Sequence, residues 1–171
     1  MSAQDVILGA RVAHLRELKA EIARLKAENA RLRDESAALA HHFDLALVAA
    51  EDLRALPPDG RLVILDGWNL VLGSGKEART PEELVARTEE YLETHPADRA
   101  WIVFDGPREN AFNEGRLRVS YTGGTGAHRA DRFILDFLRM ARWRGDLSRL
   151  RVRTCDRDFR KAVARLAPDV L

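Results

Sequence analysis

The chain has 171 residues, of which 46% are hydrophobic and 32% charged, and its formal net charge is +1. This length accommodates one domain of ordinary size with an appendage and excludes two domains with full cores. The single cysteine excludes an intramolecular disulfide and favours a reducing compartment, and no apolar run approaches the roughly 20 residues that cross a bilayer. We therefore expect a cytoplasmic protein.

The small net charge conceals an uneven distribution of charge along the chain. Residues 106–171 contain 15 Lys and Arg against 8 Asp and Glu, a net charge of +7, whereas residues 1–105 carry a net charge of −6. A basic excess of this kind is typical of a surface that binds a polyanion, but solvated surface arginines give the same count. Charge alone leaves both interpretations open.

Residues 1–56 are expected to form one long helix. Helix-favouring residues dominate this segment, and no proline occurs before Pro57. Apolar residues recur at alternating steps of three and four, which is the heptad pattern of a coiled coil. The a positions are Leu15, Ile22, Asn29, Ser36 and Phe43, and the d positions are Leu18, Leu25, Leu32 and Leu39.

The polar residues of the heptads predict a parallel homodimer. Asn29 occupies an a position, where pairing with its counterpart favours an in-register dimer at some cost in stability. Glu21 and Glu28 occupy g positions, whereas Lys26 and Arg33 occupy e positions, so that opposite charges face each other across the interface. The alternative is an amphipathic helix that packs on its own domain.

Residues 57–60, which read PPDG, form a linker, and residues 61–171 form an α/β domain. Apolar segments that resemble strands alternate with amphipathic helical segments, and this order predicts a parallel sheet covered by helices on both faces. The expected strands are 61–66, 100–105, 117–121 and 150–154, and the expected helices are 81–94, 128–143 and 157–166.

Aspartates follow three of these strands. Asp66, Asp105 and Asp156 close the segments LVILD, WIVFD and RVRTCD. Because parallel strands end at the same edge of a sheet, where ligands bind in α/β proteins, we expect the three side chains to gather there. Asp131 lies at the edge of the apolar face of a helix, where a carboxylate needs a partner, whereas Asp136 points to solvent.

Several carboxylates at one edge favour a hard divalent cation, Mg²⁺ or Mn²⁺. Combined with a basic surface, such a site predicts hydrolysis of phosphodiester bonds in a nucleic acid. Each acid also has a structural interpretation, which the sequence leaves open. Asp66 and Asp105 are suited to turns, and Asp156 and Asp158 are suited to helix caps.

Four segments, LVILDGWNL, WIVFDG, RVSYTGGTGAHRADRFI and VRTCDRDFRKAV, resemble in order and spacing the NYN branch of the PIN-like nucleases, specifically the bacterial YacP-like group. The resemblance covers residues 61–171 and not the N-terminal helix. It implies a three-layer, Rossmann-like PIN fold with a parallel sheet in the order 3-2-1-4-5, and metal-dependent ribonuclease activity. It also implies that the catalytic metal ligands are Asp66, Asp105, Asp131 and Asp156, with Asp158 as a further ligand and Asn69 as support.

The expected RNA contacts come from the glycine-rich segment YTGGTGAHRADR and from one aromatic residue. Arg129 and Arg132 flank Asp131 and are suited to contact phosphates. His128 and Thr125 belong to the glycine-rich loop, which serves either as an RNA clamp or only as a turn. Trp68 either stacks on a base or packs in the core.

The sequence therefore predicts a metal-dependent endoribonuclease with Mg²⁺ or Mn²⁺ as cofactor. Two alternatives are a non-catalytic RNA-binding adaptor dimerised by its coiled coil, and a structure-specific DNA nuclease. The expected partners are RNA, a second copy of the chain, and a larger RNA-processing or ribosomal assembly. No membrane partner is expected.

Overall fold

The computed structural model describes residues 3–73, 78–106, 111–123 and 128–171. The chain forms two compact units, Met1–Leu39 and Ala40–Leu171. One helix, α1 (Ala3–Ala55), makes up the described part of the first unit and continues into the second, in agreement with the predicted long helix. None of the described helices is both long and apolar enough to cross a membrane.

The second unit contains a five-stranded sheet in the order β3-β4-β2-β1-β5. Four of the strands are parallel, as predicted, and the short edge strand β3 (Phe112–Glu114) pairs antiparallel with β4. The parallel strands are β1 (Leu62–Asp66), β2 (Arg99–Phe104), β4 (Leu117–Tyr121) and β5 (Leu150–Arg153). The α/β class expected from the sequence is therefore confirmed.

The strand order corrects the expected 3-2-1-4-5. The parallel strands alone follow 3-2-1-4, but the fifth strand is β3, which precedes β4 in the chain and lies at the edge opposite β5. After β5 the chain forms α5 (Arg157–Leu166) and the short 3-10 helix η3 (Pro168–Val170) instead of a strand. All three residues of β3 are exposed, so the sequence lacks the alternation of apolar and polar residues that would predict this strand.

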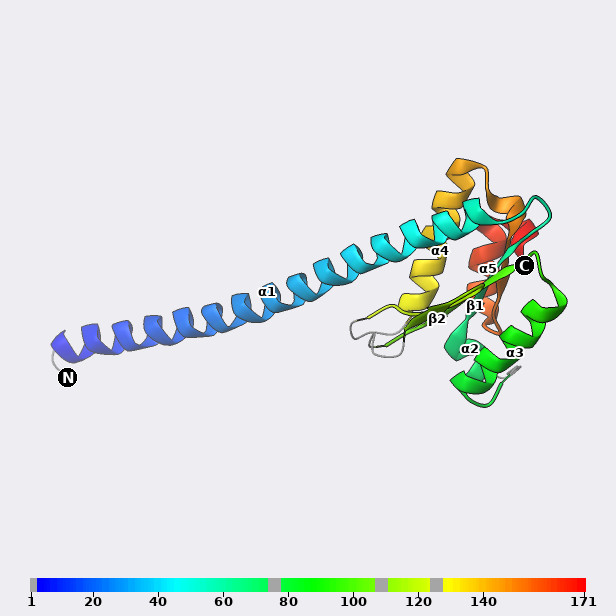
Figure 1. The fold of residues 1–171 in the computed structure, drawn as a ribbon. Coiled ribbons are helices and arrows are strands. Elements are labelled where there is room, and N and C mark those ends of the chain that lie inside the picture. The colour runs from blue at the N-terminus through cyan, green and yellow to red at the C-terminus, as the bar shows by residue number, and fades with distance from the viewer. Residues whose placement is uncertain (1–2, 74–77, 107–110, 124–127) are drawn as a thin grey trace. The chain divides into compact units, whose positions relative to one another are not determined.

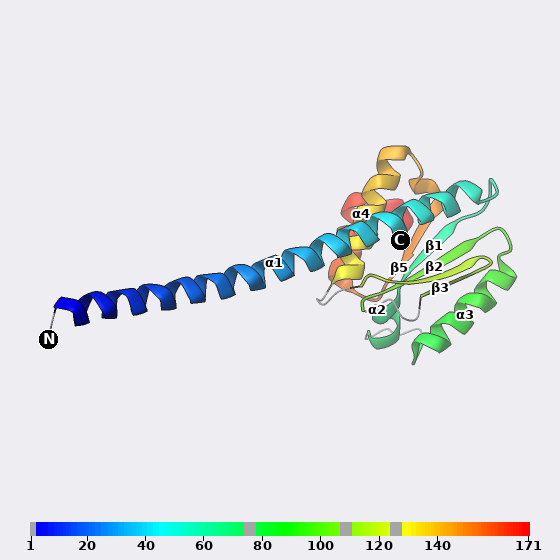
Figure 2. The same cartoon turned by 60° about the vertical axis from the view of Figure 1, so that its left-hand side comes forward.

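Helices cover both faces of the sheet (Figures 1 and 2). The helices α2 (Gly67–Leu72) and α3 (Pro81–Thr94) pack on one face. The other face is covered by α4 (Arg129–Arg144), by α5 and by the carboxyl end of α1. Within β1, Val63 and Leu65 pack toward the first face, and Leu62 and Ile64 toward the second. Burial on both faces accounts for the continuous apolar runs of the strands.

The carboxyl end of α1 belongs to the α/β unit. Leu53 and Leu56 are buried in the same apolar core as residues of the sheet and of α4. Arg149 donates hydrogen bonds to the carbonyl oxygens of both leucines, at 3.3 and 2.9 Å. The structural boundary between Leu39 and Ala40 therefore precedes the linker that we predicted at 57–60, because the last turns of the helix complete the core.

Asp52 links this end of α1 to the sheet through two ion pairs. Its Oδ1 accepts a hydrogen bond from Arg99 of β2 at 2.8 Å, and its Oδ2 accepts one from Nε of Arg118 of β4 at 3.0 Å. The side chains of Asp52 and Arg118 are only 16% and 14% exposed, so water screens their interaction weakly.

Replacing Asp52 by Ala is expected to lower the free energy of unfolding by about 2 kcal/mol, because two half-buried arginines lose their partner. Urea unfolding followed by circular dichroism measures this loss. Asp44→Ala is the matched control, because Asp44 is an exposed acid of the same helix, and its replacement should change stability by less than about 0.5 kcal/mol. Equal losses in the two variants would show that the ion pairs contribute no net stability.

Candidate functional site

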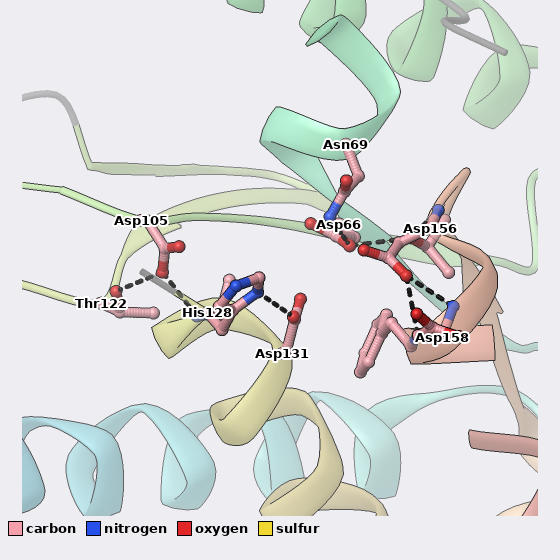
Figure 3. Close-up of polar contacts among 11 residues, drawn as sticks. Asp66, Asn69, Asp105, Thr122, His128, Asp131, Asp156 and Asp158 are labelled. Carbon is pink, nitrogen blue, oxygen red and sulfur yellow. Dashed lines mark hydrogen bonds and ion pairs between the residues drawn. The ribbon is translucent and has the colours of Figure 1, made fainter. Parts of the chain in front are cut away.

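Four aspartates lie along one edge of the sheet, and we refer to them as the acidic rim (Figure 3). Asp66 is the last residue of β1, Asp105 follows β2, Asp131 lies in the first turn of α4, and Asp156 is the N-cap of α5. Three of these positions follow parallel strands. The common direction of the strands therefore brings together residues that are far apart in the sequence.

Asp66 is the most buried member of the acidic rim, with 2% of its surface exposed. Its Oδ2 accepts hydrogen bonds from Asn69 Nδ2 at 2.6 Å and from Thr154 Oγ1 at 2.8 Å. The pKa of Asp66 is raised from 3.8 to about 6: burial is the main cause, the hydrogen bonds from Thr154 and Asn69 oppose the change, and the negative charge of Asp131 adds to it. Asp66 is thus a charged group whose ionisation costs stability near neutral pH.

Asp105 connects the ends of two strands with the start of α4. Its Oδ1 accepts hydrogen bonds from the backbone N–H of Ala130 at 2.6 Å and from Thr122 Oγ1 at 3.2 Å. The side chain of the N-cap residue, His128, makes no capping hydrogen bond. Asp105 therefore caps α4 from a different element, and its negative charge lies at the positive end of the helix dipole.

Asp131 interacts electrostatically with each of the other three acids of the acidic rim. Its side chain is 16% exposed, and its Oδ2 lies 3.0 Å from Nδ1 of His128. Burial is the main cause that raises the pKa of Asp131, and the negative charges of Asp156 and Asp105 raise it further, whereas His128 lowers it. The same helix carries Asp136 on its exposed face, as the helical periodicity predicts.

Asp156 and Asp158 have different environments. Asp156 Oδ1 accepts hydrogen bonds from the backbone N–H groups of Asp158 at 2.7 Å and Phe159 at 2.8 Å, so this acid caps α5. The carboxylate of Asp158 is exposed and accepts a hydrogen bond from Lys161 at 2.8 Å, and this contact lowers the pKa of Asp158. Asp158 therefore forms a surface ion pair with Lys161, and the metal-binding role that the resemblance implies for it stays a prediction.

Thr154 is a positioning residue that our sequence interpretation did not include. Its hydroxyl donates to Asp66 Oδ2 and accepts a hydrogen bond from the backbone N–H of Asp156 at 3.1 Å, so one buried side chain joins two acids of the rim. The sequence feature that could have indicated Thr154 is its position, because it is a polar residue directly after the strand β5. Asn69 also holds the carboxylate of Asp66, through the hydrogen bond already described.

Trp68 braces the backbone of the acidic rim. Its indole Nε1 donates a hydrogen bond to the carbonyl oxygen of Asp105 at 2.7 Å. Its ring packs edge-on against Phe104, with centroids 5.0 Å apart, and the residue is half-buried against the α2–α3 core. These contacts favour the packing interpretation of Trp68 over stacking on a base.

Basic groups lie next to Asp131 at the start of α4. The guanidinium groups of Arg129 and Arg132 make no hydrogen bond or ion pair with other residues that the structure describes, and Nε of Arg129 is buried without a partner. His128 is 71% exposed and has left-handed backbone angles, φ 61° and ψ 28°, which cost free energy in a residue other than glycine and cluster at functional sites. Thr125 lies outside the described residues.

A cavity of about 600 Å³ lies on the α3 side of the sheet, and none of the rim carboxylates lines it. Its wall contains four arginines above an apolar floor, namely Arg61, Arg87, Arg151 and Arg153. The basic excess of the chain is therefore not confined to the neighbourhood of the acidic rim.

The acidic rim offers hard oxygen donors of the kind that Mg²⁺ and Mn²⁺ prefer. As they stand, no three His, Cys, Asp or Glu side chains of the described residues come close enough to share one ion. Mg²⁺, however, keeps several water ligands and needs only one or two carboxylates. In Asp105, Asp131 and Asp156 one oxygen accepts the hydrogen bonds described above, and the other accepts none from the described residues. This donor set fits a hydrated divalent ion.

Comparison of the chain with protein-family models, curated proteins and solved structures found no match. The chemistry of the acidic rim must therefore be inferred from its own residues.

Proposed function

We propose that the protein is a Mg²⁺- or Mn²⁺-dependent endoribonuclease of the NYN and PIN-like class, with the acidic rim as its active site. The observation that carries this proposal is the mutual electrostatic influence of the rim carboxylates. Burial is the largest cause of the raised pKa of Asp66 and of Asp131, and neighbouring acids add to it: the charge of Asp131 acts on Asp66, and the charges of Asp156 and Asp105 act on Asp131. Acids that destabilise one another in this way mark a site that gains free energy when a cation binds.

The residues of the rim have distinct roles in this proposal. A divalent ion, when bound, would act as a Lewis acid that activates water and offsets the negative charge on the leaving oxygen. One or two of the carboxylates of Asp105, Asp131 and Asp156 would hold the ion directly, through the oxygens that accept no hydrogen bond from the described residues, and water ligands would complete its coordination. The buried charge of Asp66 attracts the cation, and Asn69 and Thr154 keep its carboxylate in a fixed orientation.

The substrate contacts follow from the groups beside Asp131. Arg129 and Arg132 have guanidinium groups without partners among the described residues, and they are suited to hold backbone phosphates of RNA on either side of the acid. His128 is exposed beside the same carboxylate, so its ring is accessible to the substrate. These residues orient the scissile phosphate toward the rim.

Asp131→Asn is expected to lower Mn²⁺-dependent cleavage of a labelled single-stranded RNA by at least about tenfold, because it removes the central charge of the site. Asp136→Asn is the matched control: it removes one negative charge from the exposed face of the same helix and should leave the rate unchanged. Circular dichroism checks that both variants are folded. Equal rates for the two variants, or full activity in excess chelator, would refute the proposal.

One observation favours the alternative of a non-catalytic RNA-binding adaptor. Asp105 and Asp156 cap helices, and these contacts have structural value without any metal. Calorimetric titration with Mn²⁺ separates the two functions. An adaptor shows RNA binding in the presence of chelator and no Mn²⁺ binding that depends on Asp131, whereas the nuclease shows both Mn²⁺ binding and cleavage. Parallel assays with RNA and DNA of the same sequence test the choice of substrate.

A further inference from the structure

The part of α1 within the unit Met1–Leu39 exposes an apolar stripe. Ile22 and Leu25, for example, are 52% and 45% exposed. Every residue of the two hydrophobic cores lies at or after Ala46, so neither core of the described chain covers this stripe. We define the exposed stripe by its large apolar members, which are Leu15, Leu18, Ile22, Leu25, Leu32 and Leu39.

The heptad register of the exposed stripe continues into the α/β unit. The a position that follows Leu39 is Phe43, which is 66% exposed, and the d, a and d positions after it, Ala46, Ala50 and Leu53, are partly or fully buried in the α/β unit. The same heptad positions therefore pack in an apolar core from Ala46 onward, whereas from Leu15 to Phe43 none of them belongs to either core of the described residues. A continuous register that is buried along only part of its length indicates a partner for the rest.

The surface of the exposed stripe has the shape that a second helix requires. A hollow is bordered by Ile22, Leu25, Lys26 and Asn29, which occupy positions a, d, e and a. In a parallel coiled coil, four residues at these positions form the hole that receives a d side chain of the facing helix. Leu25 of a second, in-register copy is the side chain that fits this hole.

The charges beside the exposed stripe select the orientation of that copy. Within one chain, Glu21 pairs with Arg24 at 2.7 Å, whereas Lys26 and Arg33 have no ion pair with the described residues. In a parallel dimer each g residue faces the e residue five positions later in the other chain, so Glu21 faces Lys26 and Glu28 faces Arg33. An antiparallel pair brings g to g and e to e, which places like charges together.

We propose that residues 11–39 form a parallel, in-register, two-stranded coiled coil with a second copy of this chain. Asn29 pairs with its counterpart and disfavours other registers and higher oligomers. This proposal is independent of the proposed nuclease activity, because it depends only on the apolar and charged positions of α1. The dimer would remain if the acidic rim proved inactive.

Light scattering of the full chain at tens of micromolar is expected to give the mass of a dimer. Leu25→Glu should give the mass of a monomer, because it places a charge in the central hole. Ala27→Glu is the matched control: it adds the same charge at an f position, on the outer side of the helix, and should remain dimeric. A monomeric unmodified chain, a trimer or tetramer, or a dimeric Leu25→Glu variant would overturn the proposal.

Disulfide formation tests the orientation. In a Cys155→Ser background, Ser36→Cys places a thiol at an a position, where a parallel in-register dimer brings the two copies of residue 36 together. Oxidation should then convert the variant to a covalent dimer, and Ala27→Cys in the same background should stay uncrosslinked. A dimeric mass without crosslinking through residue 36 would show antiparallel or staggered helices and would contradict the proposal.

Discussion

Replacing Asp66 by Asn is expected to abolish metal-dependent cleavage and, above pH 6, to make the folded protein more stable. Activity should fall at least about 100-fold, since the buried charge that attracts the cation is lost. Stability should rise because the carboxylate is 2% exposed, and its ionisation in this environment is unfavourable. Asn keeps an oxygen that accepts the hydrogen bonds from Asn69 and Thr154. A variant that gains stability and loses activity is typical of a functional residue.

The pH dependence of this gain follows from the pKa of Asp66, which is about 6 in the folded protein against an ordinary value of 3.8. The folded protein binds this proton more tightly than the unfolded chain does. Raising the pH from about 3 to 7, through both pKa values, therefore lowers the free energy of unfolding of the parent protein by about 3 kcal/mol in total, of which about 2 kcal/mol is lost between pH 4 and 6. The advantage of Asp66→Asn should be small near pH 4 and complete from about pH 7 upward.

Urea unfolding of the parent and of Asp66→Asn at several pH values between 4 and 8 measures this difference. Added Mn²⁺ should stabilise the parent, by about 2.7 kcal/mol at a hundredfold excess over the dissociation constant, and should stabilise the variant much less. Asp136→Asn serves again as the exposed control and should follow the parent throughout. A variant that is less stable than the parent at pH 8, or that still cleaves RNA, would contradict the role assigned to Asp66.

Gly67→Ala is expected to lower the free energy of unfolding by about 2 to 3 kcal/mol. A Cβ atom at residue 67 would lie 2.4 Å from the ring of Phe104, well inside van der Waals contact. This ring cannot easily move, because Phe104 is fully buried and packs against Trp68 and Tyr121, with centroid distances of 5.0 and 5.2 Å. In the absence of this clash, Ala would favour helix α2 by about 1 kcal/mol, so the sign of the effect reveals which term is larger.

A double-mutant cycle with Phe104→Leu tests this explanation. Phe104→Leu alone should destabilise the protein by removing core volume, and it should also make room for a Cβ at residue 67. The double variant should therefore be more stable than the sum of the single effects predicts. Additive losses, or a neutral Gly67→Ala, would show that the contact with Phe104 does not determine the residue at position 67.

The position of the acidic rim could be predicted because it depends only on the common direction of the parallel strands. Once β1, β2 and β5 are recognised as parallel strands, Asp66, Asp105 and Asp156 must follow them at the same edge. Helix α3 was equally accessible, because Thr80 and Pro81 are local start signals of a helix, and in the structure the Thr80 hydroxyl accepts a hydrogen bond from the backbone N–H of Glu83. These features depend on short segments of sequence.

Some features that the sequence did not predict depend on contacts between distant segments, and others are local but leave no periodic pattern in the sequence. Helix α2 has six residues, too few to show a helical period, and it follows β1 without an intervening loop. The capping of α4 by Asp105 joins residues 25 positions apart, and the ion pair of Asp158 with Lys161 depends on side-chain orientation at the surface. The packing of residues 40–55 on the sheet could not be predicted, because the same helix-favouring composition continues on both sides of the boundary between Leu39 and Ala40.

The docked end of α1 determines how the protein can be divided for experiments. A fragment that starts at Arg61 would lose Leu53 and Leu56 from its interior and Asp52 from between two arginines of the sheet. The apolar surface that this fragment exposes would promote aggregation. A failure of the fragment to cleave RNA would then result from misfolding and would say nothing about the activity of the full chain. Shortened versions intended to isolate the α/β unit should retain the chain from Ala40 onward.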